Sequence, residues 1–416
     1  MNSLTPITSV MIPPLRVLTP EDPAGVSGAK QLPRVLHVIN GEHYSGAERV
    51  QDLLALRLPD HGFEAGFVAL KPGRFGSCRR SVDTPLEELA MRSRWDLRAV
   101  GRVARAAQAG GYQIIHAHTP RSAMVAALAA RQLELPFVYH VHSPTSRDST
   151  RWLANLVNGR IERLSIAGAA KLITVSPTLT DHMKSLGVPD ERLRCVLNGV
   201  PKVAGAEPRK KREGVWTLGM VALFRPRKGA EVLLEALALL KSKGQDVRLS
   251  AIGPFETPDY EEHLVSLAGR LGVGNSVSWI GFTEGVGAEL DRVDALVLPS
   301  LFGEGLPMVV LEAMAAGLPV IATHCEGTAE AVAHRETGYL VEPSSVSQLA
   351  GAIDSLLTGE LDYEQASARS IARHAERFSD DAMAAQVAEV YRELLGLPDA
   401  RAESIADGLH PSEAPV

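Results

Sequence analysis

The sequence has very few cysteines. Its 416 residues include three, Cys78, Cys195 and Cys325, which lie far apart along the chain. Their spacing matches no zinc-binding pattern, and three isolated thiols cannot form a disulfide framework for a chain of this length. We therefore expect small, buried, reduced cysteines in a protein of a reducing compartment.

Long apolar runs are also lacking. No uninterrupted apolar stretch reaches the roughly 18 residues that a membrane span needs. The first 33 residues are rich in Pro, Ser and Thr, and Pro13 and Pro14 interrupt their longest apolar stretch, so they do not form a signal peptide. We expect a disordered leader at 1–33, a disordered tail at 397–416 and a cytoplasmic location.

The chain has no strong overall excess of charge of one sign. The net charge is −6, but residues 31–200 contain 22 Lys+Arg against 15 Asp+Glu, whereas residues 201–416 contain 19 against 32. Such an asymmetry predicts that the basic half meets an anionic partner. We do not expect this partner to be a nucleic acid.

Short apolar runs alternate with helical stretches in each half of the chain, which is typical of parallel strands covered by helices on both faces. The runs are at 34–40, 64–70, 113–119, 136–142, 171–176, 216–222, 247–253, 277–281, 295–299 and 319–323. They predict an α/β protein with two Rossmann-like, doubly wound parallel-sheet domains. We place these domains at 34–200 and 216–378, joined by a linker at 201–215 that is rich in Gly, Pro and charge and is expected to be solvated. A last helix is predicted at 379–396.

The segment GEGLPMVVLEAMAAG at 303–317 is the most informative part of the sequence. It follows a short buried strand and opens a helix, with Pro307 suited to the first helical position. Free backbone N–H groups at Met308, Val309 and Val310 would form an anion site that suits a diphosphate. Glu304 and Glu312 lie eight residues apart, about 12 Å along a continuous helix, but a turn can fold Glu304 back over the helix start. The alternative is two solvated or capping glutamates.

Other loops after strands carry further candidates. Arg225 and Lys228 follow the first strand of the second half, where a diphosphate would need cations, although two solvated basic residues are the alternative. His116 and His118 share one face of a strand. Strand histidines are mostly structural, and a metal site would need a third ligand that the sequence does not reveal. The loop GEHYSGAERV at 41–50 is neither a P-loop nor a G-x-G-x-x-G loop, so it gives no support to a nicotinamide cofactor.

The segment at 303–323 resembles the E-x7-E signature of retaining glycosyltransferases of family 4, which have the GT-B fold of two facing domains with a cleft between them. The resemblance implies an acceptor-binding N-terminal domain, a C-terminal domain for the nucleotide sugar and a last helix that crosses back to the N-terminal domain. It implies that Glu304 lies by the donor sugar and that His118 contacts it. The resemblance further implies that Arg225 and Lys228 bind the donor diphosphate and that Glu312 binds the ribose. Leu306, Met308 and Val309 would contact the donor at the helix start. Phe282 would lie at the nucleobase, and Gly46 would allow close approach of the backbone. Glu326 stands where the family often has glycine, which implies a specific donor sugar.

The resemblance implies a hexosyltransferase that uses a nucleoside-diphosphate sugar and a lipid-linked, glycan or small-molecule acceptor, in cell-envelope or exopolysaccharide synthesis. We expect no cofactor and no metal, because Arg225 and Lys228 would neutralise the diphosphate and no convincing Asp-x-Asp motif follows a strand. Two alternatives remain open, a UDP-sugar 2-epimerase of the same fold and a catalytically silent partner subunit.

Four arginines, Arg94, Arg98, Arg102 and Arg105, fall on one stripe of an expected helix. A solvated helix face is one interpretation. The other is peripheral contact with an anionic membrane, to which each basic residue near the surface adds about 1 kcal/mol.

Overall fold

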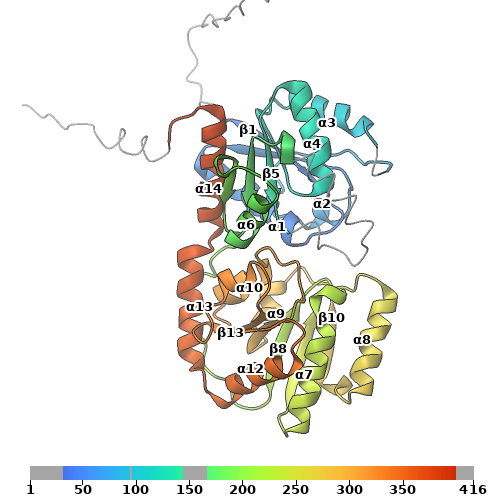
Figure 1. Cartoon of the computed structure of the whole chain (residues 1–416), viewed down its shortest axis with the longest axis vertical. Helices are drawn as coiled ribbons and strands as arrows, with labels where there is room; N and C mark the ends of the chain where they lie inside the picture. The colour runs from blue at the N-terminus through green and yellow to red at the C-terminus, as the bar shows by residue number, and fades with distance from the viewer. Residues whose placement is uncertain (1–30, 94–95, 144–165, 400–416) are drawn as a thin grey trace, which may run out of the picture. The chain divides into compact units, whose positions relative to one another are not determined.

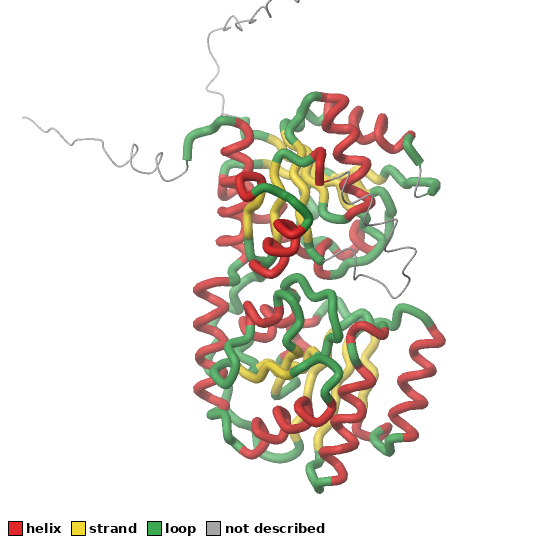
Figure 2. Tube along the Cα trace, in the orientation of Figure 1, coloured by secondary structure: helices red, strands yellow, loops and turns green. Residues whose placement is uncertain are grey.

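The computed structural model describes residues 31–93, 96–143 and 166–399. Most of the expected leader at 1–33 and most of the expected tail at 397–416 lie outside these residues. The described residues form two parallel sheets, one of seven strands and one of six. In each half, helices flank the strands (Figures 1 and 2).

The N-terminal sheet has the strand order β3-β2-β1-β4-β5-β6-β7. Its strands are β1 (Arg34–Ile39), β2 (Glu64–Ala69), β3 (Leu86–Glu88), β4 (Ile114–Ala117), β5 (Phe137–Val141), β6 (Lys171–Thr174) and β7 (Leu193–Cys195). Its helices are α1 (Gly46–Arg57), α2 (Arg74–Cys78), α3 (Arg98–Ala109), α4 (Pro120–Leu133) and α6 (Pro177–Ser185), with the 3-10 turns η1 (Leu58–His61) and η3 (Asp190–Arg192).

The C-terminal sheet has the order β10-β9-β8-β11-β12-β13. Its strands are β8 (Trp216–Val221), β9 (Val247–Ile252), β10 (Val277–Gly281), β11 (Ala295–Leu298), β12 (Val320–Thr323) and β13 (Gly338–Val341). Its helices are α7 (Ala230–Ser242), α8 (Pro258–Arg270), α9 (Val286–Leu290), α10 (Met308–Ala315), α11 (Thr328–Ala331), α12 (Val346–Thr358) and α13 (Tyr363–Arg377), with the 3-10 turns η4 (Pro226–Lys228) and η5 (Gly274–Ser276).

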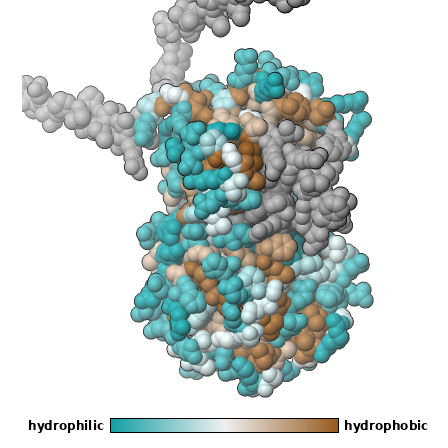
Figure 3. All heavy atoms as spheres, viewed as in Figure 1, coloured by the Kyte–Doolittle hydropathy of each residue, from teal (hydrophilic) through white to brown (hydrophobic). Residues whose placement is uncertain are grey.

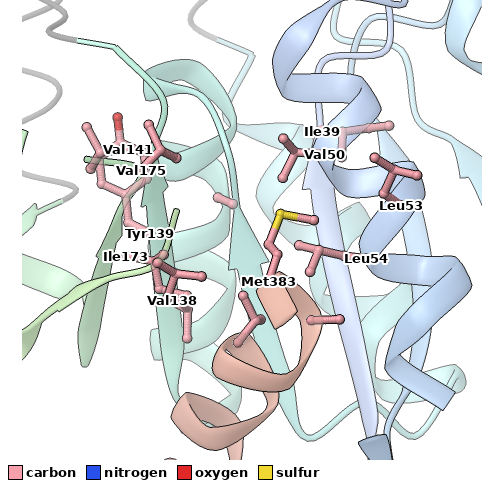
Figure 4. Close-up of a cluster of buried hydrophobic side chains, with 14 of the residues drawn as sticks. Ile39, Val50, Leu53, Leu54, Val138, Tyr139, Val141, Ile173, Val175 and Met383 are labelled. Carbon is pink, nitrogen blue, oxygen red and sulfur yellow. The ribbon is translucent and has the colours of Figure 1, made fainter. Parts of the chain in front are cut away.

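The final helix, α14 (Asp380–Leu395), packs against elements of the N-terminal half. Its Met383 joins the buried cluster that includes Ile39 of β1 and Leu54 of α1 (Figure 4). Asp380, only 3% exposed, accepts a hydrogen bond of 2.7 Å from Nε of Arg57 at the end of α1. Apolar packing and an ion pair therefore hold α14 on the N-terminal domain.

The cysteines differ from the expectation. All three are free, but Cys195 is exposed and Cys78 is half-buried, and Cys325 alone of the three is buried. Cys195 is exposed because it ends β7, an edge strand that has a neighbour on one side only. Within the described residues, every helix is too short or too polar to span a bilayer.

Candidate active site

The turn between β11 and α10 buries Glu304 among cations. The residue is 5% exposed, and its Oε1 accepts hydrogen bonds from Lys228 Nζ and, at 2.6 Å, from Ser300 Oγ. Nη1 of Arg227 lies 3.7 Å from the same oxygen. A carboxylate in this position is ionised, and it faces the cations of the loop after β8.

Close backbone packing brings the loop after β8 to this turn. Gly229 has φ +68°, and a Cβ at this position would lie 2.1 Å from the carbonyl oxygen of Pro299. The N–H of Leu301 donates to the carbonyl of Arg227 at 2.8 Å. A glycine is thus required at 229 both by its left-handed conformation and by the approach of the two loops. This packing places Lys228 beside Glu304.

The pKa values of the pair are coupled. Burial alone would raise the pKa of Glu304, but Lys228, Arg227 and the Ser300 hydroxyl outweigh burial, and the pKa lies below its ordinary value. Burial lowers the pKa of Lys228, and the attraction of Glu304 only partly opposes that shift. Glu304 is therefore ionised at neutral pH. The third cation of the loop, Arg225, lies 3.6 Å from Glu256.

The start of α10 differs slightly from the expectation. Pro307 is the residue before the first helical residue rather than the first helical residue itself. As a result the N–H of Val310 donates to the carbonyl of Pro307 at 3.1 Å, so it does not belong to the expected anion site. Met308 and Val309 stay the N–H candidates at the helix start. Leu306 is buried, and its carbonyl accepts a bond of 2.8 Å from Asn198 Nδ2.

Glu312, the expected ribose ligand, is paired with Arg49 of α1. Nη1 of Arg49 donates to Oε2 of Glu312 at 3.0 Å, and Nη2 contacts the other carboxylate oxygen. The side chains are 24% and 16% exposed. Sequence reasoning did not single out Arg49, although it lies in the SGAERV segment of the first loop. Gly46 begins the same helix, and a Cβ there would lie 3.9 Å from Cγ of Met308.

Glu326 holds the turn that carries Glu304. Its Oε2 accepts hydrogen bonds from the N–H groups of Gly303 at 3.0 Å and of Glu304 at 3.2 Å. The N–H of Gly327 donates to the carbonyl of Glu304 at 3.0 Å. A glycine at 326 would have no side chain to fill this role, so the departure from the family pattern fixes the backbone beside the expected sugar position.

His118 lies inside a group of histidines rather than in isolation. It is 2% exposed, its Nε2 is 2.9 Å from Nδ1 of His37, and its Nδ1 is 3.1 Å from Nε2 of the half-buried His142. Burial lowers the pKa of His37 and of His142 to about 3, and it lowers the pKa of His118 well below the ordinary value. These imidazoles are therefore neutral at physiological pH.

Phe282 follows β10 and is 40% exposed. The guanidinium carbon of Arg74 in α2 lies 4.2 Å from the centre of its ring, a cation–π contact. Beside it, Sγ of Cys78 lies 3.7 Å from Oε1 of Glu284. The loop expected to read the nucleobase therefore contacts a helix of the N-terminal half.

The four arginines expected on one helix face differ in their contacts and exposure. Arg94 lies outside the described residues. Arg102 donates to the carbonyl of Ala90 and to Asp96, both within 3.2 Å, whereas Arg98 and Arg105 are exposed at their positions on α3. Leu97, next to the helix start, is 63% exposed. On the face shown in Figure 3, polar and apolar residues are interspersed.

The linker is less solvated than expected. Nε of Arg209 donates to the carbonyl of Ala316 at 2.6 Å, and its Nη2 lies 2.8 Å from Asp291. Its backbone N–H donates to Ser367 Oγ at 2.7 Å. Arg209 thus fastens the linker to the C-terminal half, whereas Lys210, Lys211 and Arg212 are exposed.

Two family models match the chain. The model described as glycosyl transferases group 1 matches residues 206–375, and the model described as glycosyltransferase family 4 matches residues 44–202. Together the two matches cover every described strand except β1, and they include the Glu304 turn and His118.

Curated relatives and solved structures agree with these matches. The chain is 27% identical over 334 residues to the phosphatidyl-myo-inositol mannosyltransferase of Mycobacterium leprae, which covers 76% of this chain and 82% of the relative. It is 28% identical over 323 residues to the D-inositol 3-phosphate glycosyltransferase of Jonesia denitrificans, covering 70% and 74%. The structure of Anabaena HepE in complex with UDP-glucose has a TM-score of 0.75 at 23% identity, over 86% of this chain and 99% of that chain. Sucrose-phosphate synthase from Thermosynechococcus elongatus has a TM-score of 0.75 at 21% identity, over 88% and 100%.

Proposed function

This chain belongs to the group 1 glycosyltransferases of family 4, with the GT-B fold, and on that premise we propose that it transfers a hexose from a nucleoside-diphosphate sugar with retention of configuration. The observation that carries the proposal is the buried Glu304 carboxylate held by Lys228 and flanked by Arg227. A site for a diphosphate sugar needs cations for the diphosphate and a fixed carboxylate for the sugar, and these two loops supply both.

In this proposal Lys228 changes partners during the reaction. Without donor its ammonium is neutralised by Glu304. A diphosphate at the start of α10 would attract Lys228 and Arg225, and the N–H groups of Met308 and Val309 would complete the anion site. Glu304 would then be free to accept hydrogen bonds from sugar hydroxyls, within the turn that Glu326 fixes.

The charge that develops on the departing diphosphate would be stabilised by Arg225 and Lys228 without a metal. The acceptor hydroxyl would attack from the face that the diphosphate leaves, since no carboxylate of the described residues is singled out as a dedicated nucleophile. Glu304 and His118 would position the sugar. Glu312 would bind the ribose after exchange of its Arg49 partner.

The relatives support a proposal for the class of donor sugar. One relative is described as a mannosyltransferase and one solved neighbour holds UDP-glucose, which supports a mannose or glucose donor here. We propose a lipid-linked or glycan acceptor in cell-envelope or exopolysaccharide synthesis. Arg98 and Arg105 with the exposed Leu97 would support peripheral contact with an anionic membrane at its cytoplasmic face.

The test is a product assay with a panel of donors. Purified protein is incubated with UDP-, GDP- and ADP-linked glucose and mannose, with lipid extract as acceptor, and products are identified by mass spectrometry. We expect one donor to give a lipid product heavier by one hexose, with the anomeric configuration of the donor by NMR. No thermal stabilisation by any nucleotide would instead favour a silent partner subunit, and a changed donor sugar without transfer would favour an epimerase. Inverted configuration would contradict the retaining mechanism.

A further inference from the structure

Five histidines gather on β1, β4 and β5 of the N-terminal sheet. His37 lies opposite His116 in the β1–β4 register, His118 directly follows β4, His140 lies on β5 and His142 directly follows β5. Their rings form a continuous group, with centroids 4.2 Å apart for His116 and His118 and 4.4 Å apart for His140 and His142. Four of the five are at most 2% exposed, and His142 is half-buried.

The ring nitrogens of this group are poorly satisfied. Nδ1 of His116 bonds the hydroxyl of Tyr391 at 2.6 Å. Among the described residues, both ring nitrogens of His140 lack a partner, as do Nε2 of His37 and Nε2 of His116. A buried polar group without a partner costs about 1–3 kcal/mol. An imidazole such as His140, fully buried with both nitrogens unpartnered, therefore points to a ligand.

We propose that His118, His140 and His142 bind one divalent transition-metal ion. One ring nitrogen of each lies within 4.8 Å of the other two. Nδ1 of His118 and Nε2 of His142 are 3.1 Å apart. Two imidazole nitrogens on a tetrahedral zinc ion, each at about 2.0–2.1 Å from it, are separated by about 3.4 Å. Small shifts of the rings thus bring three nitrogens around one ion.

The surroundings of His118 suit a metal ligand. A ligating histidine usually donates its other ring N–H to an acceptor, which fixes its orientation. Here Nε2 of His118 can donate to Nδ1 of His37 at 2.9 Å, which leaves the lone pair of Nδ1 facing His142. The backbone of His142 also packs closely against Gly305, because a Cβ at position 305 would lie 1.9 Å from the carbonyl oxygen of His142.

Three neutral imidazoles select the class of ion. Zn²⁺, Co²⁺, Ni²⁺ and Cu²⁺ favour such nitrogen ligands, whereas Mg²⁺ and Ca²⁺ favour carboxylate and carbonyl oxygens. Because His142 is only half-buried, the ion would enter from its side. The fourth coordination position of the ion would be open there to water or another ligand. The sequence revealed no third ligand beside His116 and His118, whereas in the fold β5 brings His140 and His142 beside His118.

In a second triad, of His37, His116 and His118, one ring nitrogen of each also lies within 4.8 Å of the other two. It is the weaker candidate, because Nδ1 of His116 is bound to Tyr391 and because His37 and His118 bond each other. The proposed ion would use the outer triad and leave these inner contacts intact. Metal binding requires no sugar donor, but it occupies Nδ1 of His118 while Nε2 bonds His37, so with the ion bound the sugar would be positioned by Glu304. Zn²⁺ binding and glycosyl transfer are measured separately, so failure of this inference is distinguishable from failure of the proposed function.

The experiment uses the full chain without a histidine tag, treated with a chelator and dialysed. It is titrated with Zn²⁺ by calorimetry and with Co²⁺ by visible absorption, and Mg²⁺ serves as a comparison ion. We expect one Zn²⁺ per chain, intense Co²⁺ bands typical of a four-coordinate site, and no comparable heat with Mg²⁺. The variant His140→Phe keeps an aromatic ring but no ligand, and its Zn²⁺ affinity should fall at least tenfold. His263→Phe, which removes a histidine from the surface of α8, should bind Zn²⁺ like the wild type.

Several outcomes would overturn the inference. The first is a wild type that does not bind one Zn²⁺ per chain, and the second is an H140F variant that binds Zn²⁺ as tightly as the wild type. If H140F does not fold, as judged by near-UV circular dichroism, the wild-type Co²⁺ spectrum decides. A spectrum of six-coordinate Co²⁺ without four-coordinate bands would then refute the site.

Discussion

Arg49 of α1 and Glu312 of α10 form a two-point ion pair that joins the two halves of the chain. The carboxylate is the one expected to bind the ribose of the donor. A guanidinium that occupies both carboxylate oxygens competes with ribose hydroxyls for the same lone pairs. The pair therefore acts on donor binding as well as on the contact between α1 and α10.

Removal of the guanidinium should free Glu312. We expect Arg49→Gln to bind the nucleotide sugar about fivefold more tightly, which corresponds to about 1 kcal/mol for a partly exposed ion pair. Calorimetric titration with the preferred donor measures the change. Arg57→Gln is the matched control, because it removes the Arg57–Asp380 pair elsewhere on α1 and should leave donor affinity unchanged. Weaker donor binding in Arg49→Gln would show that Arg49 supports the donor site instead.

Substitutions of Glu304 in the turn and of Glu312 in the helix should change different kinetic quantities. Glu312→Gln removes a charged hydrogen-bond acceptor for the ribose. It should weaken donor binding about ten- to hundredfold, because a hydrogen bond to a charged group contributes about 1.5–3 kcal/mol. Glu304→Gln should mainly lower kcat, by about a hundredfold, because its carboxylate is expected beside the reacting sugar. Steady-state kinetics with donor titration separate the two effects. Wild-type kinetics in both variants would refute the assignment.

The fold was largely predictable because buried parallel strands are short apolar runs. All ten strand runs expected from the sequence contain observed strands. Three short strands were missed for a physical reason. All three lie at sheet edges, where one neighbour suffices. β3 (LEE) and β7 (LRC) are mostly polar and exposed, whereas β13 (GYLV) is apolar but spans only four residues.

Contacts across the site were harder to predict. Lys228 and Glu304 were both candidates, but their pairing depends on loops 76 positions apart in sequence. Arg49 and Glu312 are separated by 263 positions, and no local pattern relates them. His140 and His142 joined His118 only because β5 neighbours β4 in the sheet. Local patterns indicate which residues follow a strand, whereas the partners of their side chains depend on tertiary packing.

Gly327 is a steric requirement of the Glu304 turn. A Cβ at this position would lie 1.3 Å from the carbonyl oxygen of Gly305, so Gly327→Ala must displace the turn. We expect kcat/KM to fall about a hundredfold, as for a displacement of about 1 Å in a catalytic site. Gly351→Ala in α12 meets nothing within 4 Å and should stabilise the protein by about 0.5–1 kcal/mol. Kinetics and urea denaturation of both variants test the contrast, and full activity of Gly327→Ala would contradict the described turn.

His374 of α13 gives stability a dependence on pH. Burial lowers its pKa below the ordinary value of 6.5, and the carbonyl of Val200, 3.2 Å from Nε2, only partly opposes that shift. The unfolded chain therefore takes up a proton at a higher pH than the folded chain does. Consequently the free energy of unfolding decreases as pH falls through 6.5 towards the lowered pKa, and above 6.5 this contribution is constant. Urea denaturation of wild type and His374→Gln at pH 7.5 and pH 5 measures it. The wild type should lose more stability than the variant between these pH values, and equal losses would show that His374 titrates alike in both states. The comparison isolates His374, because the buried histidines of the N-terminal sheet are common to both proteins and their contribution cancels.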